Sequence, residues 1–217
     1  MSKTFAVSGQ HYLFDVQAFA HTILALGGDA YEYALRDRTT QGVIDDVAQG
    51  VSELGVLMVT DATKETVLSA LEEADLAFTE LAESSPRIAL GASHPLSNAK
   101  KLTLDDLADW PYLYFEQEPD ASAAFAEEAL GDVPRAKSIA CTDRASLSEL
   151  ATAMNGYTVT SGILVGITDG GSLTTVELDT PVKLHLGYVT CKDQELSRIG
   201  QRFVANLQKS LKLYARF

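Results

Sequence analysis

The sequence has no long hydrophobic run, no obvious export leader and few basic residues. A membrane-spanning helix needs about 18 or more consecutive apolar residues, and no stretch of this 217-residue chain approaches that length. The first residues also lack the basic region and apolar run of a secretory signal. We therefore expect no membrane association and a cytoplasmic location.

The residues that usually carry catalytic or metal chemistry are sparse. The two cysteines, Cys141 and Cys191, lie far apart in segments with strand character, which favours free thiols over a disulfide. The four histidines are scattered without metal-ligand spacing, and neither a phosphate-binding glycine loop nor a nucleophile elbow occurs. We expect no metal, no cofactor and no enzymatic activity.

The charge balance argues against direct nucleic-acid binding. The formal net charge is −13 at pH 7, and a chain of that sign repels the phosphate backbone of DNA. The hydrophobic content of 46% is that of an ordinary globular protein with a sizeable core.

The first 60 residues predict a β-α-β-α-β unit. Strands are expected at 4–8, 31–36 and 54–59, with helices at 12–26 and after Thr39-Thr40. This order is typical of a parallel sheet covered by helices. The apolar residues of helix 12–26 span a wide arc, so one side is expected to face the sheet and the other a second subunit.

The rest of the chain predicts a second α/β unit and then a return to the first. The second unit includes an alanine-rich helix at 121–130, with Glu127 and Glu128 on its solvated surface, and a helix at 144–154. Strands at 173–178 and 182–191 and a helix at 197–213 close the chain. We therefore expect two lobes, residues 1–82 with 176–217 and residues 83–175, joined by two crossings with a cleft between them.

Polar residues cluster where predicted strands end and helices begin. Open parallel sheets bind ligands beside those strand ends, and helix N-termini there attract anions. Taken alone, each junction is better explained as a helix cap, and Arg144 could equally pair with a nearby glutamate instead of a ligand. Together they predict a ligand-binding cleft formed by Ser8, Gly9, Gln10, Thr60, Thr142, Asp143 and Arg144.

Several segments resemble the effector-binding domain of LysR-type transcriptional regulators. The resemblance rests on the turn VSGQ, the strand LGVLMV, the segment ASHPLSNAKKLTLDDLADWPYLYF and the second-lobe stretch CTDRASLSELATAMNGYTVTSGIL. It implies a two-lobed α/β fold like that of type 2 periplasmic binding proteins, with two crossover strands and a small-molecule effector in the cleft. Carried over by position, the effector contacts would be Ser8, Gly9, Gln10, Thr60 and Thr142, with Asp143 or Arg144 as alternatives to Thr142.

The same resemblance implies partners. The family pairs side by side, with the first helix and a strand of one lobe against the second lobe of the partner. We therefore expect a homodimer through helix 12–26, with strand 31–36 as a further contact. The family's N-terminal winged helix-turn-helix is absent from this sequence, so DNA would be contacted only through that part. The main alternative is an extracytoplasmic solute-binding protein, which a signal peptide or lipid-anchor cysteine would indicate. An enzyme on the same fold is the third hypothesis.

Overall fold

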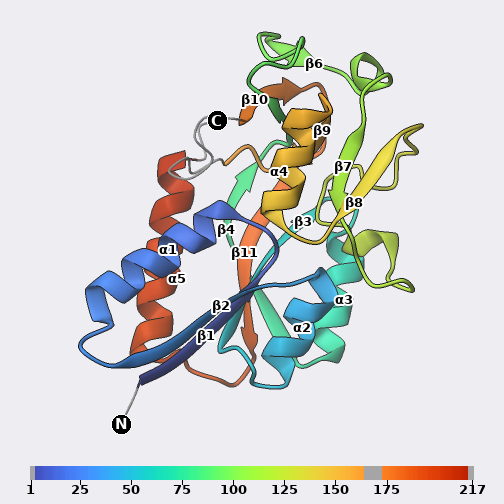
Figure 1. Ribbon diagram of the computed structural model, residues 1–217. Helices are drawn as coiled ribbons and strands as arrows, with labels where there is room; N and C mark the ends of the chain where they lie inside the picture. Colours follow the sequence, from blue (N-terminus) through green and yellow to red (C-terminus); the bar gives the residue numbers. More distant parts are fainter. Residues whose placement is uncertain (1–2, 164–172, 215–217) are drawn as a thin grey trace.

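The computed structural model describes residues 3–163 and 173–214, and these residues form two lobes, each built on its own sheet (Figure 1). The first lobe has five strands in the order β2-β1-β3-β11-β4. Their bounds are β1 (Lys3–Gly9), β2 (Tyr31–Asp37), β3 (Leu54–Thr60), β4 (Leu76–Ser84) and β11 (Leu184–Cys191). Strands β1, β2 and β3 run parallel, whereas β11 is antiparallel to β3 and β4. The predicted opening β-α-β-α-β unit is confirmed.

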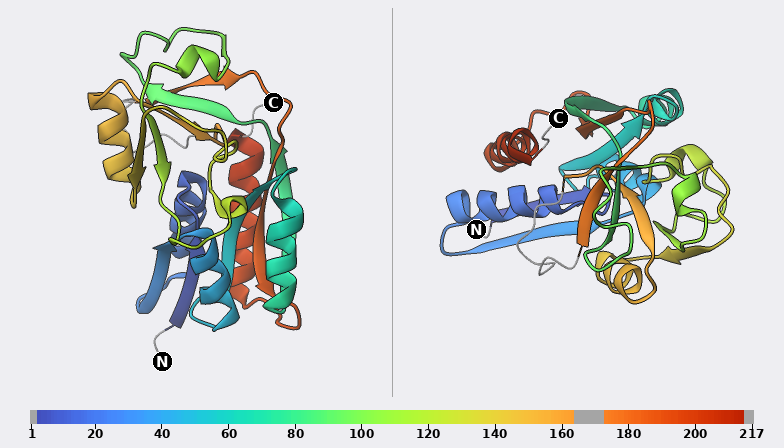
Figure 2. Two further views of the ribbon diagram at one scale, coloured as in Figure 1. Left: turned by 90° about the vertical axis from the view of Figure 1, so that its right-hand side faces the viewer. Right: turned by 90° about the horizontal axis from the view of Figure 1, so that it is seen from above.

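The second lobe has six strands in the order β6-β10-β5-β9-β7-β8. Their bounds are β5 (Arg87–Gly91), β6 (Lys101–Leu102), β7 (Tyr112–Phe115), β8 (Ser138–Cys141), β9 (Tyr157–Thr160) and β10 (Leu173–Leu178). Figure 2 shows this lobe stacked on the end of the first one. The mixed α/β, two-lobed fold expected from the sequence is therefore confirmed.

The chain crosses between the lobes twice, once between β4 and β5 and once between β10 and β11. The first sheet includes Glu83 and Ser84, which pair with His185 and Leu184. We expected the first lobe to resume at residue 176, but β10 runs in the second sheet as far as Leu178. The first sheet resumes only at Leu184.

Helices cover both faces of the first sheet because β3 is apolar on both sides. Val56 and Met58 pack with α1 (Leu13–Leu26) and α5 (Arg198–Tyr214) in one core cluster. Leu57 and Val59 face the other way and pack with α2 (Thr40–Ala48) and α3 (Lys64–Glu73). Alternate residues of a strand point to opposite faces, so the continuous apolar run of β3 packs against the helices on both faces of the sheet.

Helix α1 is buried by its own chain on two sides. Phe14 and Phe19 lie within the core, and the Phe19 ring packs against Phe203 of α5 with centroids 6.3 Å apart. Asn206 and Ser210 of α5 also hydrogen-bond to α1. Packing against α5 thus accounts for most of the wide apolar arc of α1. The sequence had suggested that a second subunit covers this side of the helix.

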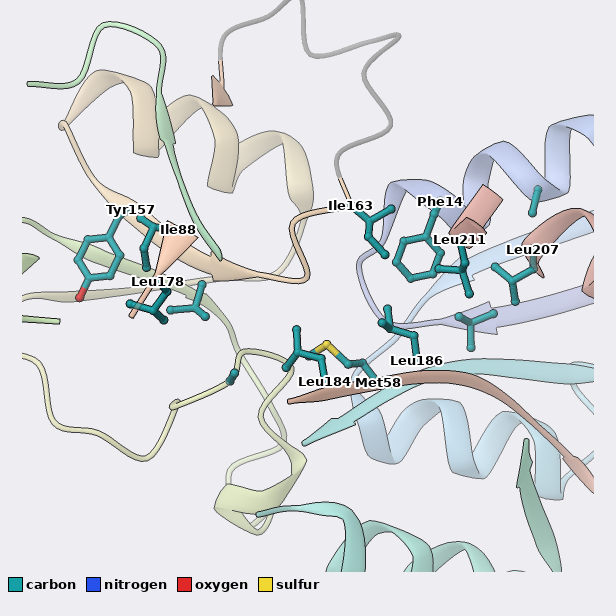
Figure 3. Packing of buried hydrophobic residues seen from close by; sticks show 14 of the residues in the cluster. Phe14, Met58, Ile88, Tyr157, Ile163, Leu178, Leu184, Leu186, Leu207 and Leu211 are labelled. Atoms are coloured by element: carbon teal, nitrogen blue, oxygen red, sulfur yellow. The ribbon is translucent and has the colours of Figure 1, made fainter. Parts of the chain in front are cut away.

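The core is continuous between the lobes. Figure 3 shows Ile163 beside Phe14 and Leu211, and Leu178 beside Tyr157 and Ile88 in the second lobe. Each large side chain removed from water contributes about 1.5–3 kcal/mol. The lobes are therefore packed against each other as well as linked by the two crossings.

The expected helix at 121–130 is wrong. Only a 3₁₀ turn at Ala123–Phe125 forms, and Leu130 has a positive φ of 61°. Glu127 and Glu128 are 4% and 5% exposed, not solvated. Their carboxylates accept hydrogen bonds from the backbone of His11 and Phe115, and these tertiary contacts override local helix propensity.

The remaining helix of eight or more residues, α4 (Arg144–Ala153), lies in the second lobe. It is followed by Asn155 at φ 50°, a left-handed conformation that asparagine tolerates after a helix. Cys141 is buried, Cys191 is half-buried, and both are free thiols, as predicted.

Candidate effector-binding site

Ser8 lies near the end of strand β1, which runs one residue further than expected, to Gly9, and its side chain is used inside the first lobe. It is fully buried, and its hydroxyl donates to Asp46 Oδ2 at 2.6 Å and bonds Ser52 Oγ at 2.8 Å. Arg38 Nε also donates to Asp46, at 2.9 Å. Ser8 therefore fastens β1 to α2.

Gln10 is likewise fully buried and has its polar atoms satisfied. Its Nε2 donates to Thr40 Oγ1 at 2.5 Å. Its Oε1 accepts from the Met58 backbone N–H at 2.9 Å and from the Tyr12 hydroxyl at 2.7 Å. These three bonds join the β1–α1 turn to α2 and β3.

Gly9 is required by close packing. A Cβ at this position would lie 2.5 Å from Asp15 Oδ2, which is too short for any contact. Asp15 is fully buried, and burial raises the pKa of its carboxyl to about 8, although the charge of Arg144 opposes the shift. Asp15 is consequently neutral at pH 7 beneath Gly9.

Thr60 and Thr142 have different roles. Thr60 is 6% exposed and exchanges hydrogen bonds with Thr63, the residue before α3, so its hydroxyl stabilises the turn between β3 and α3. Thr142 is exposed and does not line the pocket described below. A hydrogen bond with its backbone helps to raise the pKa of His11.

Asp143 and Arg144 begin helix α4 and face the other lobe. Asp143 caps the helix by accepting from the Ser146 N–H at 2.8 Å, and this bond lowers the pKa of Asp143. Arg144 donates to the Tyr12 carbonyl at 2.5 Å and pairs with Asp37 at 2.9 Å. Arg144 thus connects α4 to the start of α1 and the end of β2.

A pocket of about 610 Å³ opens between the lobes beside Arg144. This volume is within the roughly 300–1,000 Å³ typical of small-molecule sites. Both lobes form its walls: His11, Tyr12, Leu13, Val16 and Asp37 from the first, and Ala89, Phe115, Asp143, Arg144, Ala145, Leu147, Ser148, Glu149, Thr158, Thr160, Ser161, Ile163 and Leu173 from the second.

The pocket lining combines apolar and polar side chains. Leu13, Val16 and Ile163 supply apolar surface, and Thr158, Thr160 and Ser161 supply hydroxyls from β9 and the segment after it. Arg144 is the arginine of the lining, and its charge is already balanced by Asp37. An anionic ligand must therefore compete with Asp37 for this guanidinium.

Beside the cleft, a set of contacts joins the two lobes, and we call it the interlobe bridge. It connects His11 and Thr40 of the first lobe to Phe115, Gln117, Phe125 and Glu127 of the second. The Glu127 carboxylate accepts from the His11 backbone N–H and bonds its Nδ1, both at 3.0 Å. The His11 ring stacks on Phe115, with centroids 3.9 Å apart. Thr40 donates to Gln117 through its N–H and to the Phe125 carbonyl through its hydroxyl.

The bridge changes the acid–base behaviour of His11. Burial alone would lower the pKa of this imidazole, but the hydrogen bond to Glu127 and the charges of Glu127 and Asp37 outweigh burial and raise it. The His11 side chain is 5% exposed. Protonation of His11 therefore strengthens its contact with Glu127.

Two of the seven predicted residues, Asp143 and Arg144, line the pocket, whereas Ser8, Gly9, Gln10, Thr60 and Thr142 do not. The sequence reasoning missed Thr158 and Thr160, although their alternation along β9 places them on one face. It also missed His11 and Tyr12, which immediately follow the predicted turn.

Among residues 3–163 and 173–214, no group of three or more His, Cys, Asp or Glu side chains could hold a metal ion. Within the same residues, no helix is both long and apolar enough to cross a membrane.

Two lobes with separate sheets, two crossings and a pocket between them define a class of two-lobed ligand-binding domains. The chain matches the family model of the LysR substrate binding domain over residues 31–212, and it therefore belongs to that family. It is an effector-binding regulatory domain of the LysR type, and the solute-binding-protein alternative is not favoured.

Solved structures agree on the fold. The CcmR regulatory domain of Synechocystis PCC6803, in complex with 2-PG, is 15% identical with a TM-score of 0.67, covering 96% of this chain and 97% of that one. The effector-binding domain of QuiR, in complex with shikimate, is 12% identical with a TM-score of 0.64 and full coverage of both chains, 100% each.

The LysR family regulator HinK from Pseudomonas aeruginosa is 17% identical with a TM-score of 0.65, covering 98% of this chain and 72% of HinK. A comparison with curated protein sequences gives no match.

Proposed function

We propose that this domain senses a small polar metabolite bound in the 610 Å³ interlobe pocket. The observation that carries the proposal is that the N-terminal ends of α1 and α4, one from each lobe, line the same pocket. A ligand there contacts both lobes, so it binds one interlobe angle more tightly than another and shifts the population toward it.

The lining favours an effector with an apolar body and one polar end. The apolar body packs on Leu13, Val16 and Ile163, and the hydroxyls of Thr158 and Thr160 bind its polar groups. A carboxylate on the effector gains Arg144 by displacing Asp37, which would open the link between α4 and β2. The complexes of QuiR with shikimate and of CcmR with 2-PG support a small metabolite as the ligand class.

The test uses one substitution that fills the pocket and one that does not. Ala145 lines the pocket, whereas Ala153, on the same helix, does not; both are exposed. A thermal-shift screen of small polar metabolites identifies a ligand, and calorimetry then measures its affinity. Ala145→Trp should weaken binding at least about tenfold, equivalent to about 1.4 kcal/mol, while Ala153→Trp should leave it unchanged. Equal affinities in the two variants would contradict the proposal.

The partner through which the signal passes is a second copy of the chain. On α1 and β2, Leu24 is 85% exposed and Tyr31 is 48% exposed, and Tyr31 stacks on Tyr33 with centroids 4.8 Å apart. Strand β2 is also an edge of its sheet, with backbone groups open to pairing. The DNA contacts belong to a helix-turn-helix part outside this sequence, and the complete regulator works in the cytoplasm.

Dimerisation is tested by light scattering of the purified chain. Leu24→Glu should reduce the measured mass from dimer to monomer. Val51→Glu, at a site 42% exposed in the first lobe before β3, is the matched control and should not change it. An unaltered mass for Leu24→Glu would exclude this surface.

A further inference from the structure

A second pocket lies entirely within the second lobe. It has a volume of about 310 Å³ and is lined by residues of β7, of β8 and of the segment from Gln117 to Arg135. Phe115 lines this pocket as well as the interlobe pocket, so the two are neighbours. No predicted site residue belongs to it.

Three residues that line this pocket have a polar atom buried without a hydrogen-bond partner among the described residues: Glu128 Oε2, the Tyr112 hydroxyl and Arg135 Nη2. Glu128 and Tyr112 are 5% and 4% exposed. A buried polar atom without a partner costs about 1–3 kcal/mol, and native proteins rarely leave several together. The concentration of three in one pocket wall indicates that a ligand supplies the missing partners.

The other atoms of these side chains hold them in place. Glu128 Oε1 accepts from the Phe115 N–H at 2.8 Å. Arg135 donates through Nη1 to the carbonyls of Leu130 and Val133, and its Cζ lies 4.6 Å from the centroid of the Tyr112 ring. The free atoms therefore belong to groups that are already ordered, which lowers the entropic cost of binding.

The donor groups around the pocket favour an anionic ligand. Arg135 Nη2 and the Tyr112 hydroxyl can both donate. Burial raises the pKa of the Glu128 carboxyl well above its ordinary value, and the neighbouring charge of Glu127 raises it further, which favours the protonated form. A protonated Glu128 whose Oε1 accepts from Phe115 can donate through Oε2.

We propose that this pocket binds a short-chain monocarboxylate, whose carboxylate accepts hydrogen bonds from Arg135, Tyr112 and Glu128. Its carbon chain packs on Tyr114, Val133 and Pro134. A dianion such as phosphate is disfavoured, because Arg135 alone supplies positive charge while Asp132 lines the same pocket. This site is independent of the effector pocket proposed above.

The test compares three ligands of the same size: butyrate, the neutral butyramide and the cationic butylamine. Titration calorimetry and amide chemical shifts should detect butyrate and neither of the others. Binding of butylamine in place of butyrate would show that Glu128 is ionised and would overturn the ligand class. Binding of none would show that the pocket holds only water, and the proposal would be wrong.

Variants then assign the site. Tyr112→Phe should weaken butyrate binding at least about tenfold, because it removes one donor. Tyr33→Phe is the matched control, since its hydroxyl is also buried without a partner but lines neither pocket. It should leave butyrate affinity unchanged, as should Ala145→Trp in the interlobe pocket. Equal losses in Tyr112→Phe and Tyr33→Phe would reject the assignment.

The pH dependence provides a readout that a purely structural role of Glu128 would not produce. Butyrate affinity should fall as pH rises through the raised pKa of Glu128, because the ionised carboxylate repels the ligand. Glu128→Gln keeps a neutral donor and should bind butyrate with no such fall. A pH-dependent loss that persists in Glu128→Gln would contradict the proposal.

Discussion

The β1–α1 junction and the β8–α4 junction look alike in sequence but differ in the structure. The first carries Ser8 and Gln10, both fully buried and bonded within their own lobe. The second carries Asp143 and Arg144, which line the interlobe pocket. Strand β1 lies between β2 and β3, whereas β8 is an edge of its sheet.

Strand position alone does not explain this contrast. Strand β2 is also an edge strand, and Thr40, which follows it, is buried and hydrogen-bonded to Gln10, Gln117 and Phe125. The available partners decide which polar groups of a junction are already satisfied, and substitutions at the two junctions test the contrast.

The largest effect is expected at Gln10. Gln10→Leu removes the partners of the Met58 N–H, the Tyr12 hydroxyl and Thr40, and should lower the free energy of unfolding by about 3 kcal/mol. Urea denaturation measures the loss. Gln201→Leu, at an exposed amide of α5, is the control and should change it by less than about 0.5 kcal/mol. Similar losses of unfolding free energy in Gln10→Leu and Gln201→Leu would contradict the stabilising role of the buried Gln10 side chain.

An intermediate effect is expected at His11, which belongs to the β1–α1 junction. Because its folded pKa is raised above the ordinary value of 6.5, its contribution to stability is fully present below that pH. The contribution is lost as pH rises through the folded pKa. Urea denaturation over this range should show that the free energy of unfolding of the wild type falls as pH rises. His11→Gln should remove the part of this pH dependence that His11 contributes.

An NMR titration of the His11 ring measures its folded pKa independently of the stability measurement. The His11 imidazole should titrate above 6.5. A titration below that value would mean that burial outweighs Glu127, and the interlobe bridge would then not depend on a charged histidine.

The smallest effect is expected at Thr142. Its side chain is exposed and does not line the interlobe pocket. Thr142→Ala should change the free energy of unfolding by less than about 0.5 kcal/mol and leave ligand affinity unaltered. A loss of affinity in calorimetry would place the ligand nearer to this turn than the structure indicates.

The order of strands and helices was predictable because it depends on local periodicity. The run Leu54–Thr60 is buried throughout, as a strand covered on both faces must be. Segment 121–130 was not predictable in this way. Its alanines favour a helix, but Glu127 is held by His11, 116 residues away in sequence.

The site was predictable only in part for the same reason. Polar residues at a strand end are visible in the sequence, and two of the residues predicted from them, Asp143 and Arg144, line the interlobe pocket. Whether such a residue faces a ligand depends on distant partners, such as Asp46 for Ser8 or Thr40 for Gln10. A single sequence does not state those pairings.

The most direct measurement is a crystal structure of the domain with a metabolite identified by the thermal-shift screen. The account predicts the ligand between α1 and α4, within hydrogen-bond distance of Arg144 or Thr160. A ligand bound instead against the side chains of Ser8, Gln10 and Thr60 would contradict it.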